Sequence, residues 1–339
     1  MTSEQFDSQT VIQKIQASIQ ENPVIVLGSG ASAPHIPGMG ALAKHLETNL
    51  SPEAAHVDTW KSIKDKLLAG IGLEEAFNSV QIPESLGNLI VKLSWNYLTL
   101  SDREYFNKTL VGNGEYPLTK LLRALHQTSN SYSTVITSNY DRLVEYAADQ
   151  AGFEFQTGFV ARHCGSFYPE SLKKSPATPV GPPKILRILK PHGSLDWFID
   201  NNSNPVFLSS PPPSGHFTPL IVAPGIDKFR RTHEDPLRSI LNIADEALQN
   251  AGSIACFGYG FNDPHLHPVI NRRLNSSIHH VLIVAKELSA NARKLLGHKS
   301  VIAIEQLNGG SRVHLGDKGS AEMPDHILWN LDGFSNTIL

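Results

Sequence analysis

The stretch VIVLGSGASAPHIPGMGALAKHL, residues 24–46, decides the expected fold. Its four branched apolar residues, Val24 to Leu27, have the pattern of a short strand that is buried on both faces of a parallel sheet. The small-residue turn 28–32 follows directly, and residues 40–50 then place leucines on one helical face. Such a strand, turn and helix let backbone N–H groups reach the pyrophosphate of a dinucleotide. The glycine pattern ends on Ala33, a tolerated variant, and an ordinary tight turn also favours glycine.

Length and composition narrow the class of protein. The 339 residues suffice for one large domain with insertions or for two domains. The net charge of −3 gives no basic footprint for nucleic acid. Cys164 and Cys256 are too few for a disulfide framework or a four-cysteine zinc site. The polar first residues are unlike a secretory signal, and no apolar run approaches the ~20 residues of a membrane span. We therefore expect a cytoplasmic protein with no membrane or direct nucleic-acid partner.

Strands and helices alternate along the chain, which predicts an α/β fold with a doubly wound, Rossmann-like parallel sheet. Apolar runs predict strands at residues 24–27, 133–137, 184–190, 219–225 (with its turn), 253–257, 281–285 and 301–304. Helical spacing predicts helices at residues 8–20, 236–250 and 289–296, and residues 153–183 and 201–219 are expected to be loops.

The expected domain organisation has three parts. Residues 1–23 form an N-terminal helix, and residues 24–305 form the main domain. Residues 51–130 have helical spacing without a convincing strand, so we expect a helical insertion lobe within that domain. Residues 306–339 are expected to be a glycine-rich tail with one weak helical segment at 326–331.

Four predicted strands end in turns whose polar residues are suited to binding or catalysis. These turns are GSGAS (residues 28–32), TSNYD (137–141), KPHGS (190–194) and GYGFNDPH (258–265). If the strands are parallel, all four turns lie at one edge of the sheet and converge on one crevice. Taken singly, Asn139 and Asp141 could be helix caps and His192 a packed histidine. His265 and His267 alternate in DPHLHP without a supporting ligand cluster, so we expect no metal site.

In their order and at these strand ends, the motifs resemble the sirtuin-like family, and most nearly its divergent prokaryotic branch that hydrolyses NAD in anti-phage defence. The resemblance covers residues 20–305 apart from the insertion and the proline-rich loops. It implies that the catalytic residues are Asn139 and His192. It also implies that the residues that bind NAD are Gly28, Ser29, Gly30, Ala31, Ser32, Asp141, Gly258, Tyr259 and Phe261.

Departures from the family pattern are also informative. Sirtuins that deacylate proteins carry two CxxC pairs on a zinc module, which this chain lacks, so no zinc module is expected. Their arginine-bearing PDFR segment is replaced by PGMGALA (residues 37–43). Ala285 and Lys286 stand where those enzymes have an asparagine after the late strand. These changes argue against protein deacylation.

The residues suit NAD cleavage, which passes through an oxocarbenium-like transition state. Asn139 can hold a ribose hydroxyl and a water together, and His192 can accept a proton from either. Asp141, if ionised, could accept hydrogen bonds from the carboxamide. We expect an NAD glycohydrolase that yields nicotinamide and ADP-ribose and serves as a defence effector. The expected partners are further copies of the chain and, as in related defence systems, a HerA-type ATPase. The alternatives are a non-catalytic module that binds NAD or ADP-ribose and, less favoured, a deacylase.

Overall fold

The computed structural model describes residues 7–126, 132–160, 163–173, 184–213, 215–223, 234–276 and 278–339. The proline-rich stretch expected to be a loop at residues 174–183 and the turn expected at 224–225 lie outside these residues. No helix in the described part of the chain combines the length and the apolar character needed to cross a bilayer.

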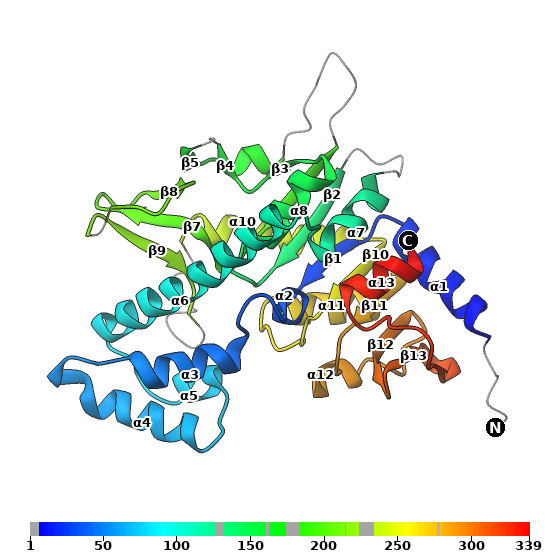
Figure 1. Ribbon diagram of the computed structural model, residues 1–339, viewed down its shortest axis with the longest axis horizontal. Helices are drawn as coiled ribbons and strands as arrows, with labels where there is room; N and C mark the ends of the chain where they lie inside the picture. Colours follow the sequence, from blue (N-terminus) through cyan, green and yellow to red (C-terminus); the bar gives the residue numbers. More distant parts are fainter. Residues whose placement is uncertain are drawn as a thin grey trace, which may run out of the picture.

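The centre of the molecule is a nine-stranded sheet (Figure 1). In spatial order its strands are β14 (Ser320–Met323), β13 (Gly310–Leu315), β12 (Val301–Leu307), β11 (His280–Val284), β10 (Ser253–Phe257), β1 (Val24–Leu27), β2 (Tyr132–Thr137), β6 (Ile185–Leu189) and β3 (Glu154–Gln156). Neighbours from β12 to β3 run parallel, whereas β12, β13 and β14 pair antiparallel. The predicted parallel sheet is confirmed, with an antiparallel extension at one edge.

Helices cover both faces of this sheet, so it is doubly wound as predicted (Figure 1). One face carries α1 (Ser8–Gln20), α7 (Pro117–His126), α8 (Leu143–Ala151) and α13 (Leu331–Ile338). The other face carries α10 (Leu237–Asn250), α11 (Leu266–Leu274) and the short α12 (Ala290–Arg293). In β1, Ile25 and Leu27 pack under the first set of helices and Val26 under the second. Both faces of the strand are thus apolar, as the unbroken run of branched residues predicts.

A helical lobe projects from one end of the sheet (Figure 1). It contains α3 (Met39–Asn49), the 3-10 turn η1 (Ala54–His56), α4 (Val57–Leu68), α5 (Leu73–Asn78) and the first part of α6 (Glu84–Val111). Leu46, Trp60, Phe77 and Ile90 form the core of the lobe. The long α6 then leaves the lobe, and Phe106 packs against the core of the main sheet. The helical character of the predicted insertion is confirmed, although α7, its last helix, covers the sheet.

A second, antiparallel sheet corrects two predictions of loops. Its strands are, in spatial order, β4 (Phe159–Val160), β5 (Cys164–Phe167), β8 (Pro205–Leu208), β7 (Gly193–Asp200) and β9 (Phe217–Ile221). Parts of the expected loops at residues 153–183 and 201–219 are therefore strands. The first of these two ranges also contains β3, which belongs to the main sheet, and the short 3-10 turn η2 (Pro169–Leu172), which follows β5. The strand predicted at 219–225 joins this sheet instead of the main one. Apart from β7, these strands have only two to five residues, too few to show the alternation that marks a strand in sequence.

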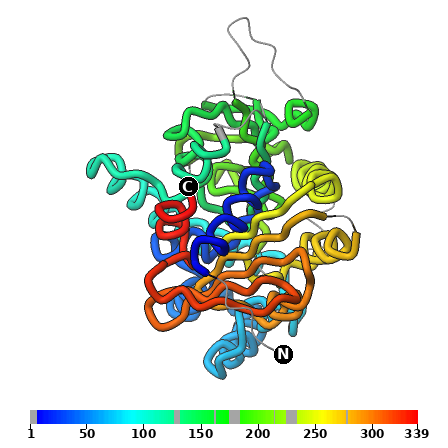
Figure 2. The backbone as a smooth tube through the Cα atoms, turned by 90° about the vertical axis from the view of Figure 1, so that its right-hand side faces the viewer, coloured from blue at the N-terminus to red at the C-terminus, as the bar shows by residue number. Residues whose placement is uncertain are grey.

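The C-terminal segment also differs from the expected glycine-rich tail. Strands β12 and β13 form a hairpin, and Figure 2 shows the last strands side by side at the edge of the sheet. The hairpin turn is Asn308–Gly309, and both residues have positive φ angles (43° and 91°). Asn-Gly is the typical sequence of such a two-residue turn, so a local signal was present. The helical segment expected at residues 326–331 is wrong apart from its last residue, because α13 begins at Leu331, with Asn330 as its N-cap, and ends at Ile338. The division into domains at residues 23/24 and 305/306 stays a prediction.

Candidate active site

The four polar turns lie side by side, as predicted. They follow β10, β1, β2 and β6, which are consecutive neighbours in the sheet. After β1 the chain continues to β2 on one side and later returns to β10 on the other side, so β1 marks the switch point at which open α/β sheets bind ligands.

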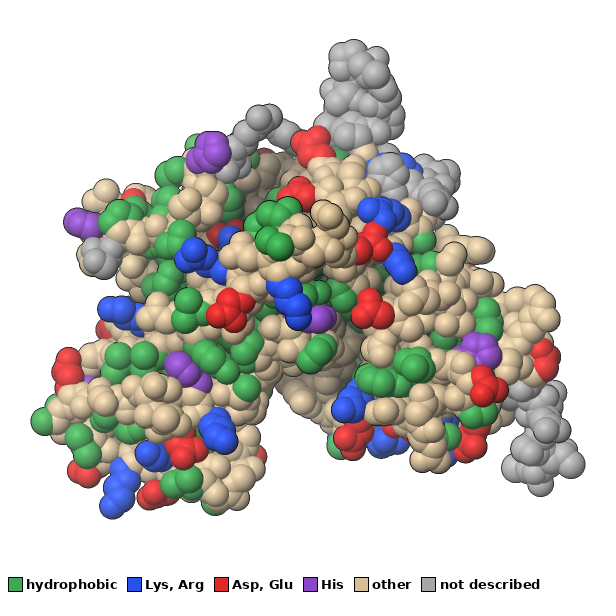
Figure 3. Space-filling model, in the orientation of Figure 1, with side chains coloured by type: hydrophobic (Ala, Val, Ile, Leu, Met, Phe, Trp, Pro, Cys, Tyr) green, Lys and Arg blue, Asp and Glu red, His purple; other side chains and the backbone are tan. Residues whose placement is uncertain are grey.

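A cavity of about 240 Å³ lies at this edge of the sheet. The surface of the molecule is hollowed between the lobe and the body (Figure 3). The lining comes from both: Gly28, Ser29, Ser32, Ile36, Pro37, Gly38, Met39, Leu42, Glu74, Leu98, Ser138, Asn139, Tyr140, Asp141, His192, Val222, Gly258, Tyr259, Gly260, Asn262 and Asp263.

Glycine backbones hold the turns after β1 and β10 together. The N–H of Gly30 donates to the carbonyl of Gly258 (3.1 Å), and Gly258 has a φ angle of +57°. A Cβ atom on Gly258 would lie 2.1 Å from the backbone nitrogen of Ala31. Only glycine fits such an approach. The turn after β1 continues as α2 (Ser29–Ser32), a single helical turn.

Asn139 lies at the end of β2, and its amide is oriented by the turn after β1. Its Nδ2 donates to the carbonyl of Gly28 (2.9 Å) and to Oγ of Ser32 (3.0 Å). Because a carbonyl only accepts, the NH₂ group must face Gly28. The side-chain oxygen Oδ1 of Asn139 therefore keeps its lone pairs for a ligand, since no described residue donates to it.

Asp141 is part of the same hydrogen-bond network as Asn139 and Ser32. Ser32 Oγ donates to Oδ2 of Asp141 (2.8 Å), and the N–H of Leu143 donates to Oδ1 (3.2 Å). Burial raises the pKa of the Asp141 carboxyl, although the ammonium of Lys190 acts in the opposite direction. Asp141 thus borders the cavity and also supports Ser32 and, through it, Asn139.

His192 lies on the tight turn between β6 and β7. The N–H of Gly193 donates to the carbonyl of Lys190 (3.0 Å), and the N–H of Val222 donates to the carbonyl of His192 (2.9 Å). Gly193 has a φ angle of +88°, and a Cβ there would lie 2.0 Å from the carbonyl oxygen of Leu220. The backbone on both sides of His192 is therefore fixed, and its largely buried ring borders the same cavity as Asn139.

Asp263 is the partner of His192, and the sequence analysis missed it. Its Oδ2 lies 3.0 Å from Nε2 of His192, at ion-pair distance but without the geometry of an in-line hydrogen bond. Its Oδ1 accepts the N–H groups of His265 (2.8 Å) and Leu266 (3.1 Å). Burial alone would raise the pKa of Asp263, but the His192 contact and the two backbone donors together hold it well below its usual range. Asp263 is thus an ionised carboxylate against the imidazole.

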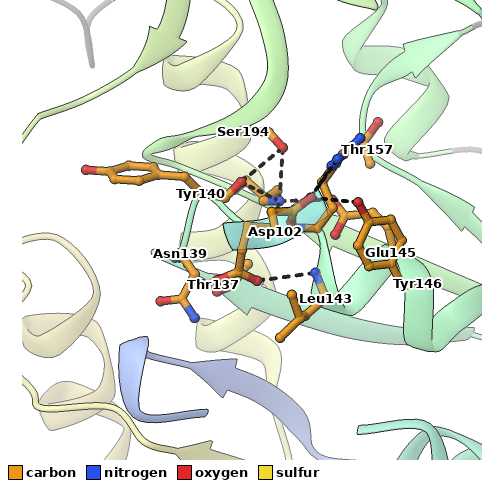
Figure 4. A network of polar contacts seen from close by, with 12 residues as sticks. Asp102, Thr137, Asn139, Tyr140, Leu143, Glu145, Tyr146, Thr157 and Ser194 are labelled. Carbon is orange, nitrogen blue, oxygen red and sulfur yellow. Dashed lines mark hydrogen bonds and ion pairs between the residues drawn. The ribbon is translucent and has the colours of Figure 1, made fainter. Parts of the chain in front are cut away.

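Two ion pairs fix the loop that carries Asn139. Lys190 is fully buried, and its Nζ donates to the carbonyls of Tyr140 and Asp141, to Ser194 Oγ and to Glu145 Oε1. Figure 4 shows Ser194, Tyr140 and Glu145 around this point.

The second pair is Arg142–Asp102, which ties the same loop to α6. Figure 4 shows Asp102 beside Tyr146. Asp102 accepts from the backbone and the guanidinium of Arg142 and from the hydroxyl of Tyr146. Sequence reasoning missed both pairs because they join residues 40 to 45 positions apart.

Most of the predicted site residues border the cavity. Those that do are Gly28, Ser29, Ser32, Asn139, Asp141, His192, Gly258 and Tyr259. Gly30, Ala31 and Phe261 do not: Gly30 and Ala31 contact Gly258, and Phe261 is fully buried against the ring of Tyr259. The hydroxyl of Tyr259 is buried and has no hydrogen-bond partner among the described residues.

Further lining residues come from the lobe, where the sequence gave no hint of a site. Ile36, Met39, Leu42 and Leu98 supply apolar surface, and Glu74 supplies a carboxylate from the first turn of α5. In the sequence Leu42 and Leu98 have only the helical spacing of an ordinary apolar core, and Ile36 lies between two prolines. No group of three or more histidine, cysteine, aspartate or glutamate side chains able to hold a metal ion occurs among the described residues.

Among solved structures, the chain is similar to several Sir2 proteins. A Sir2 homologue solved as a complex with NAD shares 15% identity and a TM-score of 0.44, over 83% of this chain and 84% of that one. A variant Sir2 homologue complexed with ADP-ribose shares 14% identity and a TM-score of 0.46, over 98% and 96%. A Sir2 enzyme bound to a propionylated peptide shares 13% identity and a TM-score of 0.42, over 82% and 88%.

No curated protein matches the sequence. A family model described as "SIR2-like domain" matches residues 133–304, just over half of the 339 residues and including the turns after β2, β6 and β10. The chain therefore belongs to the SIR2-like domain family.

Proposed function

We propose that the protein binds NAD⁺ in this cavity and hydrolyses it to nicotinamide and ADP-ribose. One observation carries the proposal. Asn139 and His192, which lie 53 positions apart in sequence, border the same cavity, and each is held by its own buried hydrogen-bonded or ionic support. An amide with a free oxygen and an imidazole with a carboxylate partner are suited to orient a ribose and to take up a proton.

The reaction breaks the bond between the nicotinamide nitrogen and C1′ of the ribose. The bonding electron pair leaves with nicotinamide, which departs neutral, so no acid is needed for the leaving group. The oxocarbenium-like ribose is then attacked by water, which forms the new C1′–O bond. His192 accepts the proton of this water, and Oδ1 of Asn139 holds a ribose hydroxyl or the water in place. Asp141 keeps its proposed place beside the carboxamide.

The biological role is proposed from the resemblance of the four motifs. We infer an effector of anti-phage defence that acts in the cytoplasm and empties the NAD pool of the infected cell when triggered. Uncontrolled hydrolysis would be toxic, so the activity has to be held in check. The proposed means of control are self-association and a HerA-type ATPase.

The test measures nicotinamide release from NAD⁺ by the purified full chain, alone and with the candidate ATPase. Asn139→Ala and His192→Ala should both abolish release. His279→Ala, at an exposed histidine at the opposite end of the sheet, and Asn107→Ala, at an exposed asparagine of α6, should leave it unchanged.

Three outcomes would overturn the proposal. Activity that persists in both site variants would remove Asn139 and His192 from the chemistry. Tight NAD⁺ binding by calorimetry without turnover, with the partner present, would instead make the protein a binding module. Deacylation of an acyl-lysine peptide would favour the second alternative, an NAD-dependent deacylase.

A further inference from the structure

We infer that Asp263 fixes the tautomer of His192, with the proton on Nε2, so that Nδ1 is the nitrogen that accepts a proton. This inference rests on the proposed function and deepens it, because it names the atom that acts as base and the residue that positions it. Asp263 is a positioning residue, since it acts through the imidazole.

The hydrogen-bond partners of the Asp263 carboxylate divide between its two oxygens. Oδ1 accepts the N–H groups of His265 and Leu266 at the start of α11. Oδ2 is buried, and in the described part of the chain it forms one polar contact, the ion-pair contact with Nε2 of His192 at 3.0 Å. A carboxylate of this kind offers only acceptors and would repel a ring lone pair that faced it, so the contact favours the tautomer whose proton is on the facing nitrogen.

The other ring nitrogen of His192 is the one left for chemistry. No described residue forms a hydrogen bond or ion pair with Nδ1, and the side chain keeps 14% of its surface exposed where it borders the cavity. A neutral imidazole with its proton on Nε2 has its basic lone pair on Nδ1. When Nδ1 accepts the proton of the attacking water, the resulting imidazolium lies against the Asp263 carboxylate and is stabilised by it.

The position of the pair in the fold explains why it spans the site. His192 follows β6 and Asp263 follows β10, and the ends of β1 and β2 lie between these two strands. The contact between His192 and Asp263 therefore spans the ends of β1 and β2, which are followed by Gly28 and Asn139. The backbone constraints on Gly193 and on α11 fix the two partners independently of each other.

The decisive variant is Asp263→Asn, which removes the carboxylate charge and keeps the hydrogen bonds to the backbone at the start of α11. The asparagine carbonyl oxygen can still accept the N–H groups at the start of α11, because asparagine caps helices as well as aspartate does. Its NH₂ group then faces His192 and donates, which forces the proton from Nε2 to Nδ1. The matched control is Asp200→Asn, since Asp200 also accepts two backbone N–H groups, from Asn202 and Asn204, but contacts no histidine.

The first readout is the tautomer itself, measured by nitrogen-15 NMR of histidine-labelled protein without NAD⁺, with His192→Ala to identify the signals. We expect the proton on Nε2 in the parent chain and in Asp200→Asn, and on Nδ1 in Asp263→Asn. A parent His192 with its proton on Nδ1, or no change in the variant, would overturn the inference.

The second readout is the kinetics of NAD⁺ hydrolysis. A wrong tautomer in an Asp–His pair costs about 10⁴-fold in kcat in the serine proteases, so we expect a loss of about 10²- to 10⁴-fold here, with KM nearly unchanged. Loss confined to KM would overturn the assignment of Nδ1 as base. If the tautomer changes as expected but the parent chain releases no nicotinamide, the proposed hydrolysis fails while the positioning of His192 stands.

Discussion

The wall of the cavity formed by the sheet and the wall formed by the lobe differ in what holds their residues in place. The sheet-side wall consists of the turns after β1, β2, β6 and β10, whose side chains are fixed by glycine contacts, short hydrogen bonds and buried charges. The lobe-side wall consists of Ile36–Met39, Leu42, Glu74 and Leu98. Leu42 is held by the apolar core of the lobe, and Ile36 and Leu98 by a small apolar cluster.

This difference assigns different tasks to the two walls. Directional contacts allow almost no movement, which suits groups that must meet reacting atoms within a fraction of an ångström. Apolar contacts tolerate changes of shape at small cost, which suits a surface that only has to fit the ligand. The sheet-side wall should therefore control the chemical step and the stability, and the lobe-side wall should control affinity.

The largest effect is expected for Lys190→Met, which removes the buried ammonium from the sheet-side wall. Glu145 would then be buried without its ionic partner, and breaking a buried ion pair costs about 3 to 5 kcal/mol. Urea unfolding would measure the loss, and Lys92→Met on the exposed side of α6 should change stability by no more than about 0.5 kcal/mol. A loss below about 1 kcal/mol for Lys190→Met would mean that the charge does not hold this wall.

Gly258→Ala should have a somewhat smaller effect. The positive φ angle of Gly258 costs an alanine about 1 to 2 kcal/mol, and the added methyl group, which would meet the backbone of Ala31, costs about 1 to 3 kcal/mol more. Gly40→Ala is the matched variant in the lobe, because nothing lies within 4 Å of its Cβ position in α3. It should stabilise the protein by about 0.5 to 1 kcal/mol in the same unfolding experiment. Equal changes in the free energy of unfolding for the two variants would mean that the two walls do not differ in rigidity.

The same contrast decides how much of the molecule could be predicted from sequence. The run Val24–Leu27, the turn after it and the polar ends of β2, β6 and β10 are local patterns, and the parallel sheet brings these ends together by its own geometry. Their convergence was therefore predictable. The contribution of Asp263 was not, because its contact with His192 depends on the order of strands and on where two separate turns point.

Predictions failed where the sequence pattern was weak or was shared with ordinary cores. Most strands of the second sheet have only two to five residues, and β8 has four apolar residues without a polar one, so residues 201–219 resembled a loop. Leu42 and Leu98 follow the same helical spacing as any core residue, which hides their place at the cavity. The hairpin at Asn308–Gly309 was different, because its turn has a recognisable sequence that was overlooked.

The pH dependence of stability tests whether burial disfavours the ionised form of Glu145 in its pair with Lys190. Burial raises the pKa of Glu145 from 4.5 to about 7, against the opposing effect of Lys190. Between these two pH values the folded state holds a proton that the unfolded state has released, so this group lowers the free energy of unfolding as the pH rises. Glu145→Gln lacks this term. Urea unfolding of both proteins across that range should show that the variant gains stability relative to the parent as the pH rises. A stability difference that stays constant with pH would contradict a raised pKa of Glu145 in the folded state.

The smallest effect is expected on the lobe-side wall, for Met39→Ala. Met39 borders the cavity and is already 38% exposed, so its removal costs the bound NAD⁺ no more than about 1 kcal/mol of apolar contact. This corresponds to a rise in KM of at most about fivefold. The value of kcat should stay within about twofold, because α3 contributes no hydrogen bond to the sheet-side network and so does not move Asn139 or His192. Val57→Ala, at an exposed lobe residue away from the cavity, should change neither constant. A fall in kcat as large as the rise in KM would show that the lobe takes part in the chemical step, and the division of tasks between the two walls would then be wrong.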